Sequence, residues 1–334
     1  MNICICGGGS LGHVCAGVLA VHHDVRVNML TGRPAQWNSE LIVRDPDGKK
    51  YISTLNKVSD KPADVVPDAD LVLICQPGFL IEHTLREIQP YISPKTAVGS
   101  IVSSTGFFFK AHEVLPDMIP LFGFQRTPFI ARVDEYGRSA FLLGYKKEVS
   151  VAVENIADVE AFRKTIEDLF LTPAVVLDNF YEASLTNSNP ILHTGRLYSM
   201  WHDWDGKPYD HNILFYKEWT DAASQLLIDM DNEFMTLLTV LGVSFKAVPS
   251  LLDYYESVDA ASLTRKISSI QAFQTITSPM KQVESGWVPD FRSRYFIEDF
   301  PFGLKIIKEQ AQKHDVPTPV IDKVLAWGMS VAEL

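Results

Sequence analysis

Apolar and polar positions change their spacing about halfway along the chain. Up to about residue 178, short apolar runs alternate with segments of helical period, which is typical of an α/β domain with a doubly wound, mainly parallel sheet. The clearest helix of this part is 159–170, whose apolar positions recur at amphipathic spacing. The strands predicted for this part are 3–6, 25–30, 70–75, 96–101, 120–125, 140–145, 150–153 and 174–177.

A β-hairpin at 41–56 is expected to interrupt this alternation. The segment Asp45-Pro46-Asp47-Gly48 is a strong turn signal between two strand-like runs. After residue 178 the strand signals fade and helical periods dominate. We therefore predict an α/β domain over 1–178 and an all-helical domain over 179–334. The helices predicted for the second domain are 180–202 (bent at Pro190), 214–241, 263–276, 301–314 and 320–332.

A glycine-rich turn follows the first predicted strand and opens a helix-compatible segment. Its glycines, Gly7, Gly9 and Gly12, have the G-x-G-x-x-G spacing of dinucleotide-binding turns in Rossmann domains. In that motif the first glycine permits the turn, the second lets the pyrophosphate approach the backbone, and the third lets helix and strand pack closely. A helix N-terminus then offers free N–H groups to the phosphates. We predict that the three glycines bind a nicotinamide cofactor together with Ser10 and Leu11.

The second predicted strand ends at a position that indicates which cofactor is preferred. About 20 residues beyond the glycines, this motif usually has an Asp or Glu that binds the ribose 2′-hydroxyl. Thr31 and Arg33 stand there instead. A hydroxyl and a guanidinium suit a 2′-phosphate, so the sequence favours NADP(H) over NAD(H). The plainer interpretation of Arg33 is a solvated turn residue.

Gln76 and Pro77 come directly after the apolar strand predicted at 70–75, and a helix is expected at 80–89. In open α/β sheets, ligands bind outside the carboxyl ends of the strands. We therefore predict that both residues border the cofactor, with ordinary loop chemistry as the alternative.

Composition and charge narrow the range of partners. The chain has 334 residues and a net charge of -11, which disfavours a nucleic-acid partner because phosphate backbones call for a basic surface. No apolar run reaches the roughly 18–20 residues of a membrane span. No signal-peptide pattern is present either. We expect a cytoplasmic protein with small-molecule partners, and a homodimer is compatible with the sequence.

The four cysteines do not form a metal-binding pattern. Cys4, Cys6, Cys15 and Cys75 all lie on apolar segments of the first predicted domain, and none has CxxC spacing. Cys4 and Cys6 alternate along one strand, so they are expected on the same face of the sheet. We interpret them as reduced, buried thiols and expect no metal.

His193 is the main candidate for proton transfer in the second half. It lies in the segment 187–195, NSNPILHTG, where Asn189 and His193 would be i,i+4 neighbours on a helix. Histidine suits general acid–base catalysis because its ordinary pKa lies near neutral. A single histidine on a helix is nevertheless more often structural.

A second candidate region, 290–304, combines arginines, acids and aromatic residues before a predicted helix. The plain interpretation makes Asp299 a helix N-cap with Pro301 in the first turn. The alternative interpretation is functional: Asp299 pairs with His193, so that the carboxylate orients the ring and stabilises its protonated form. Arg294 is suited to bidentate binding of a substrate carboxylate.

Taken together, these segments resemble the NAD(P)-dependent octopine/nopaline, or opine, dehydrogenases, within the 6-phosphogluconate-dehydrogenase-like group. The matching segments extend over nearly the whole chain, and the last of them is the most specific. They read GGGSLGH at the N-terminus, NSNPILHTG at 187–195, FYKE at 215–218 and RYFIEDFPFGL at 294–304.

The resemblance implies a reaction in which an α-keto acid condenses with the amino group of an amino acid and the resulting imine is reduced by NAD(P)H. It implies that His193 is the general acid–base and that Asp299 holds it. The residues expected to bind the substrates are Arg294, Asn189, Gln125 and Arg132.

Two alternatives remain open. A ketopantoate-reductase-like enzyme would act on a keto acid alone, but those proteins have a lysine at the helix position of His193. A dinucleotide-binding sensor without turnover is the alternative from another class. The aromatic, acidic segment 201–206, WHDWDG, would either line the substrate pocket or only cover the neighbouring helices.

Overall fold

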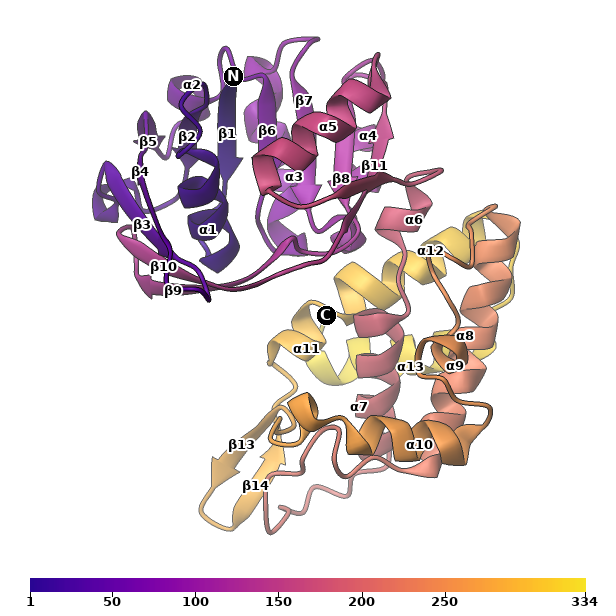
Figure 1. The fold of residues 1–334 in the computed structure, drawn as a ribbon. Helices are drawn as coiled ribbons and strands as arrows, with labels where there is room; N and C mark the ends of the chain where they lie inside the picture. Colours follow the sequence, from indigo (N-terminus) through magenta and orange to yellow (C-terminus); the bar gives the residue numbers. More distant parts are fainter. The chain divides into compact units, whose positions relative to one another are not determined.

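The computed structural model describes residues 1–334 and divides them into two compact units, Met1–Ser184 and Leu185–Leu334 (Figure 1). The division comes six residues after the predicted boundary at 178. Helix α6 (Tyr181–Ser184) accounts for the difference, because it packs on strands and a turn of the first unit. No helix of either unit is long and apolar enough to cross a bilayer.

The first unit is built on an eight-stranded sheet in the order β12-β11-β8-β7-β6-β1-β2-β5. All neighbours pair in parallel except β8 and β11, which are antiparallel. The order reverses between β1 and β6, and this reversal is where ligands bind in doubly wound sheets. The strands are β1 (Asn2–Cys6), β2 (Arg26–Leu30), β5 (Lys57–Ser59), β6 (Leu71–Ile74), β7 (Ala97–Ile101), β8 (Leu121–Phe124), β11 (Val149–Glu154) and β12 (Ala174–Val176).

Helices cover both faces of this sheet. Successive side chains of a strand point to opposite faces, and in these buried strands both sets are apolar, so each face needs a covering layer. Ile3 and Ile5 belong to the core beneath α1 and α5, whereas Cys4 and Cys6 belong to the core beneath α3 and α4. The two cysteines therefore share a face, as the strand period predicts, and all four cysteines are free and buried. The helices of this unit are α1 (Ser10–Leu19), α2 (Pro62–Val65), α3 (Gly78–Ile88), α4 (Phe107–Val114), α5 (Val159–Phe170) and α6.

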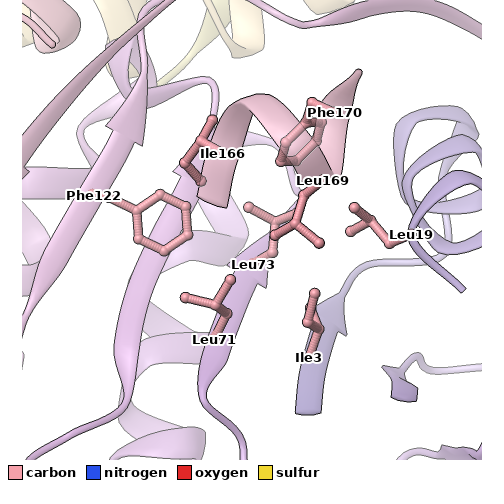
Figure 2. A pocket seen from close by; sticks show the side chains of 8 residues that line it. All are labelled: Ile3, Leu19, Leu71, Leu73, Phe122, Ile166, Leu169 and Phe170. Atoms are coloured by element: carbon pink, nitrogen blue, oxygen red, sulfur yellow. The ribbon is translucent and has the colours of Figure 1, made fainter. Parts of the chain in front are cut away.

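A small apolar cavity lies between α5 and the sheet (Figure 2). All of its lining residues are apolar, so it is a packing gap rather than a site for a polar ligand. The lining residues are Ile3, Leu19, Leu71, Leu73, Phe122, Ile166, Leu169 and Phe170.

A second sheet of four strands, in the order β4-β3-β10-β9, packs against α1. The predicted hairpin at 41–56 forms its β3 (Glu40–Arg44) and β4 (Lys50–Thr54). The other two strands, β9 (Phe129–Glu135) and β10 (Ser139–Tyr145), are joined by a short turn at 136–138. Gly17 on α1 permits the close contact, since a Cβ there would lie 2.2 Å from a methyl carbon of Val43.

The second unit is helical, with one short hairpin that the sequence pattern did not predict. The segment predicted as one helix over 180–202 is broken. After α6 the chain forms a π-helical turn, η4 (Ser188–His193), which continues into α7 (Thr194–Trp201). The remaining elements are α8 (Asp221–Val240), α9 (Leu251–Tyr254), α10 (Ala260–Ser269), β13 (Met280–Val283), β14 (Gly286–Pro289), α11 (Arg294–Ile297), the π-helical turn η6 (Phe300–Leu304), α12 (Lys305–Lys313) and α13 (Pro319–Ala332).

Candidate active site

The backbone of the glycine-rich turn suits the approach of a pyrophosphate. Gly7 has a φ of +118°, and a Cβ there would lie 2.6 Å from the carbonyl oxygen of Cys75. A Cβ on Gly12 would lie 1.9 Å from the carbonyl oxygen of Gly7. A Cβ on Gly9 would meet nothing within 4 Å, so its backbone faces open space. Each glycine thus fits the role that its position in the motif predicts.

The start of α1 also suits an anion. Gly9 is the N-cap, no side chain caps the helix, and no acidic residue occupies the first turn. The side chain of Ser10 is already engaged, because its Oγ accepts a hydrogen bond from the Val133 N–H at 3.1 Å. Leu11 packs against the core beneath α1. Because Ser10 Oγ only accepts in this contact, its O–H can still donate to a phosphate, whereas Leu11 can contribute only its backbone.

Gln76 and Pro77 follow β6 beside this turn. A Cβ on Gly7 would lie 2.8 Å from the Gln76 Cγ. The Gln76 Oε1 accepts a hydrogen bond from the Thr84 hydroxyl at 2.7 Å, which holds the side chain, and Pro77 is the N-cap of α3. These positions are next to the strand-order reversal between β1 and β6. The residues of the turn therefore fit a dinucleotide.

Thr31 and Arg33 lie where β2 ends. Thr31 is buried, and its Oγ1 lies 3.3 Å from the Tyr136 hydroxyl. Arg33 is exposed, and its guanidinium carbon lies 5.6 Å from the centroid of the Tyr136 ring. Tyr136 is distant in sequence and was not predicted as a neighbour. It belongs to the turn between β9 and β10.

In the helical unit, the two nitrogens of His193 both have hydrogen-bond partners. Its Nδ1 lies 2.8 Å from Asp299 Oδ2, and its Nε2 lies 3.1 Å from the Tyr216 hydroxyl. The side chains of His193 and Asp299 are 14% and 17% exposed. Since a carboxylate accepts hydrogen bonds, the pair places a proton on Nδ1, and Nε2 is left to exchange a proton with another group. The contact joins η4 to the start of η6.

Aromatic residues enclose the imidazole of His193. Tyr295 and Phe215 lie 4.7 Å and 5.7 Å from it, measured between ring centroids. Burial raises the pKa of Tyr216 well above its ordinary value, so its phenol stays protonated at neutral pH. In the neutral state of His193, the Tyr216 hydroxyl can therefore donate to Nε2.

Arg196 on α7 fixes the backbone that carries Tyr216. Its Nε donates to the Phe215 carbonyl at 3.1 Å, and its Nη2 donates to the Glu218 carbonyl at 2.7 Å. Burial lowers the pKa of Arg196 to about 10, so it remains charged at neutral pH. Arg196 and Tyr216 were not predicted as site residues. Tyr216 lies in the FYKE segment, which was assigned to a helix that in fact begins at Asp221, and Arg196 directly follows the segment 187–195.

Glycine allows the two segments of the pair to approach each other. A Cβ on Gly303 of η6 would lie 2.9 Å from the Pro190 Cγ of η4. The stiff proline ring cannot move aside as a flexible side chain would, so only glycine fits without displacing η6. The close contact between η4 and η6 brings Asp299 to His193.

The residues predicted to bind substrate are divided between the two units. Arg294 is 77% exposed, and its guanidinium makes two hydrogen bonds to Glu298, with N–O distances of 3.0 Å and 2.7 Å. Asn189 is exposed on η4, where the wider π-helical turn replaces the i,i+4 alignment with His193 expected for a regular α-helix. In the first unit, Gln125 donates to the Glu182 carbonyl at 2.8 Å, and Arg132 is exposed on β9.

The segment 201–206 contacts the adjacent Lys207 and the aromatic residue Phe291. Trp204 Nε1 donates to the Lys207 carbonyl at 2.7 Å, Asp205 pairs with Lys207, and the Trp204 ring packs edge-on against Phe291. These contacts favour a covering role over a part in the substrate pocket.

Comparison with known proteins gives one match for the helical part of the chain and another for its N-terminal part. Residues 176–332 match the family described as NAD/NADP octopine/nopaline dehydrogenase, alpha-helical domain, and residues 3–120 match ketopantoate reductase PanE/ApbA. An opine dehydrogenase of Haliotis discus hannai is 28% identical over 98% of this chain and 89% of that protein. A tauropine dehydrogenase of Arabella iricolor is 29% identical over 98% of this chain and 90% of that protein.

A solved structure of octopine dehydrogenase with NADH and L-arginine superposes with a TM-score of 0.90 at 26% identity, covering 100% of this chain and 90% of that one. The fold and these similarities define an NAD(P)-dependent oxidoreductase that acts on CH–NH bonds. Residues 176–332 are therefore the alpha-helical domain of the NAD/NADP octopine/nopaline dehydrogenase family, and the chain is similar over nearly its whole length to opine and octopine dehydrogenases.

Proposed function

We propose that this opine-type dehydrogenase uses NADPH and that His193 is its general acid–base. The observation that carries the proposal is the pair of hydrogen bonds on His193. Asp299 holds the proton on Nδ1, and the other nitrogen, Nε2, faces a protonated phenol. A proton can therefore enter and leave at Nε2 while the ring stays oriented.

The cofactor supplies the hydride when it is bound. The backbone of Gly7, Gly9 and Gly12 and the free N–H groups of α1 suit its pyrophosphate. Arg33, with Thr31 beside it, suits a ribose 2′-phosphate, because β2 is followed by no carboxylate that would repel one.

In the proposed reaction, the amino group of an amino acid adds to the keto carbon of an α-keto acid. One proton of the amine nitrogen and the Nε2 proton of protonated His193 pass to the former carbonyl oxygen, which leaves as water while the C=N bond forms with one N–H retained. Hydride addition to the carbon of this protonated imine then gives the secondary amine. Asp299 stabilises the protonated ring, and Tyr216 holds Nε2 in place between turnovers.

Both substrates carry a carboxylate, and Arg294 is proposed to bind one of them. Its guanidinium is exposed and is already oriented by Glu298, so a substrate carboxylate would share or replace that partner. Asn189, Gln125 and Arg132 remain predictions as further substrate-binding residues.

The test is an assay of NADPH oxidation with pyruvate and a panel of amino acids. Oxidation is expected only when both carbon substrates are present. Oxidation with the keto acid alone would instead support a keto-acid reductase, which the match of 3–120 to ketopantoate reductase makes the second candidate. NADPH binding without oxidation under any combination would contradict both enzymes and favour a sensor.

A further inference from the structure

An aromatic cluster made of His13, Trp37 and Tyr136 covers the glycine-rich turn of the first unit. His13 is fully buried, with its Nδ1 2.9 Å from the Gly9 carbonyl oxygen, and its Nε2 accepts the Gly137 N–H at 2.8 Å. Its ring stacks on Trp37 at 4.2 Å and meets the edge of Tyr136 at 5.0 Å.

The hydrogen bonds of His13 connect two loops that are far apart in sequence. Because Nε2 accepts a backbone N–H, the single proton of the neutral ring is on Nδ1 and is donated to Gly9. Burial lowers the pKa of His13, which keeps the ring neutral at pH 7. The side chain therefore fixes the β9–β10 turn relative to the glycine-rich turn.

Tyr136 reaches from the β9–β10 turn to both parts of the predicted cofactor site. Its hydroxyl lies 3.3 Å from the Thr31 Oγ1, and a Cβ on Gly8 would lie 2.6 Å from that hydroxyl. On the other side, the Arg33 guanidinium lies over the Tyr136 ring at 5.6 Å. Arg33 is exposed, so its N–H groups are accessible to an anionic ligand.

We propose that Tyr136 is a specificity-determining residue, which holds Arg33 where a ribose 2′-phosphate would lie. His13 acts as a positioning residue that places the Tyr136 turn. A guanidinium stacked on an aromatic face keeps its N–H edges free and loses fewer rotamers when it binds a phosphate. The proposal rests on the NADPH preference proposed above, and it assigns part of that preference to the second sheet.

The experiment measures the Kd of NADPH and of NADH by calorimetry for the full chain and its variants. Tyr136→Leu removes the aromatic face and is expected to raise the Kd of NADPH about three- to fivefold while changing that of NADH less than twofold. Tyr136→Phe keeps the ring and should keep the ratio of the two constants. Arg33→Ala should abolish most of the preference, and adding Tyr136→Leu to it should change nothing further.

A matched control is available on the same sheet. The Arg44 guanidinium lies 5.8 Å from the Phe141 ring, away from the glycine-rich turn, so Phe141→Leu removes a similar stacked pair. It should leave both dissociation constants unchanged. If Tyr136→Leu does not fold, Tyr136→Met keeps the volume without an aromatic face and tests the same point.

The outcomes separate the two proposals. If Arg33→Ala lowers the preference and Tyr136→Leu does not, the role of Tyr136 is wrong and the NADPH proposal stands. An equal loss for NADPH and NADH in Tyr136→Leu would also overturn its role in specificity. If Arg33→Ala leaves the ratio of the two constants unchanged, the NADPH proposal itself fails.

Discussion

At the scale of single residues, the proposed chemistry depends on His193 and on what Asp299 does to it. His193→Ala should lower kcat by roughly 10²–10⁴-fold, the usual contribution of a general acid–base, and leave the Kd of NADPH unchanged. Asp299→Asn keeps the shape of the side chain but removes the carboxylate that stabilises the protonated ring. Its loss of kcat is expected to be smaller than that of His193→Ala. Because Asp299 acts through His193, the double variant should be no slower than His193→Ala.

Steady-state kinetics and calorimetry on the three variants check this prediction. Losses that multiply in the double variant would show that the two residues act independently, despite the 2.8 Å contact between them. Wild-type turnover in His193→Ala would remove this residue from the mechanism.

Asp231 on α8 is a buried carboxyl that makes stability depend on pH. It is 4% exposed and accepts hydrogen bonds from the Asn187 side chain and the Leu251 N–H. Burial raises its pKa from 3.8 to about 6. Between these two values the folded chain holds a proton that the unfolded chain has released. The stabilisation is therefore complete below about pH 4 and is lost as the pH rises through 6, at a cost of roughly 3 kcal/mol.

Urea unfolding between pH 4 and pH 7, compared with Asp231→Asn, isolates this effect. The variant cannot titrate at this position, so the wild-type advantage in free energy of unfolding should shrink as the pH rises. A difference that stays constant over this range would show that the pKa of Asp231 is not raised.

At the scale of elements, the contact between η4 and η6 depends on Gly303. In Gly303→Ala the new methyl group would lie 2.9 Å from the Pro190 ring, so η6 must shift and carry Asp299 away from His193. We expect a loss of about 1–3 kcal/mol in stability and a fall in kcat that approaches that of Asp299→Asn. Thermal unfolding and steady-state kinetics measure the two effects.

Gly144→Ala on β10 is the matched control. A Cβ there would meet Ile130 at 3.5 Å, which is ordinary van der Waals contact. It should leave both readouts close to wild type. Full activity in Gly303→Ala would contradict the view that this glycine brings the pair together.

The elements also show how far periodicity alone predicts this fold. Helix α5 begins and ends at the predicted residues, and the hairpin around Asp45–Gly48 forms, because both signals are local. Strand β9 was missed because its apolar run, Phe129–Ala131, is short and three of the next four residues are charged. The helix predicted over 180–202 is broken where Asn187 bonds to Asp231 and to the Pro249 carbonyl, contacts that depend on distant parts of the chain.

The residues of the candidate site also differ in whether a local sequence pattern could reveal them. The glycine turn was visible because its function dictates its local spacing. Asp299 was paired with His193 by a chemical argument and a resemblance, across 106 residues that no local pattern could connect. Tyr136 was not found from the sequence, because its contact with Thr31 spans 105 residues. Tyr216 lies in the FYKE segment that the resemblance singled out, but its hydrogen bond to His193 was not predicted.

At the scale of the whole molecule, the residues proposed for cofactor preference and for proton transfer belong to different units. Arg33 and Tyr136 lie within Met1–Ser184, whereas His193 and Asp299 lie within Leu185–Leu334. The two hydrophobic clusters of the first unit are made only of its own residues. Such a unit has the core it needs to fold by itself.

We therefore expect a fragment of residues 1–184 to fold and to bind NADPH in preference to NADH without any turnover. Trp37 is the single tryptophan of this fragment and stacks on His13 beside the glycine-rich turn, so its fluorescence should change when NADPH binds. Titration of that signal, with Arg33→Ala in the same fragment as the control, gives the ratio of the two dissociation constants. A folded fragment that binds both cofactors equally, while the full chain prefers NADPH, would place the determinant of preference outside the first unit.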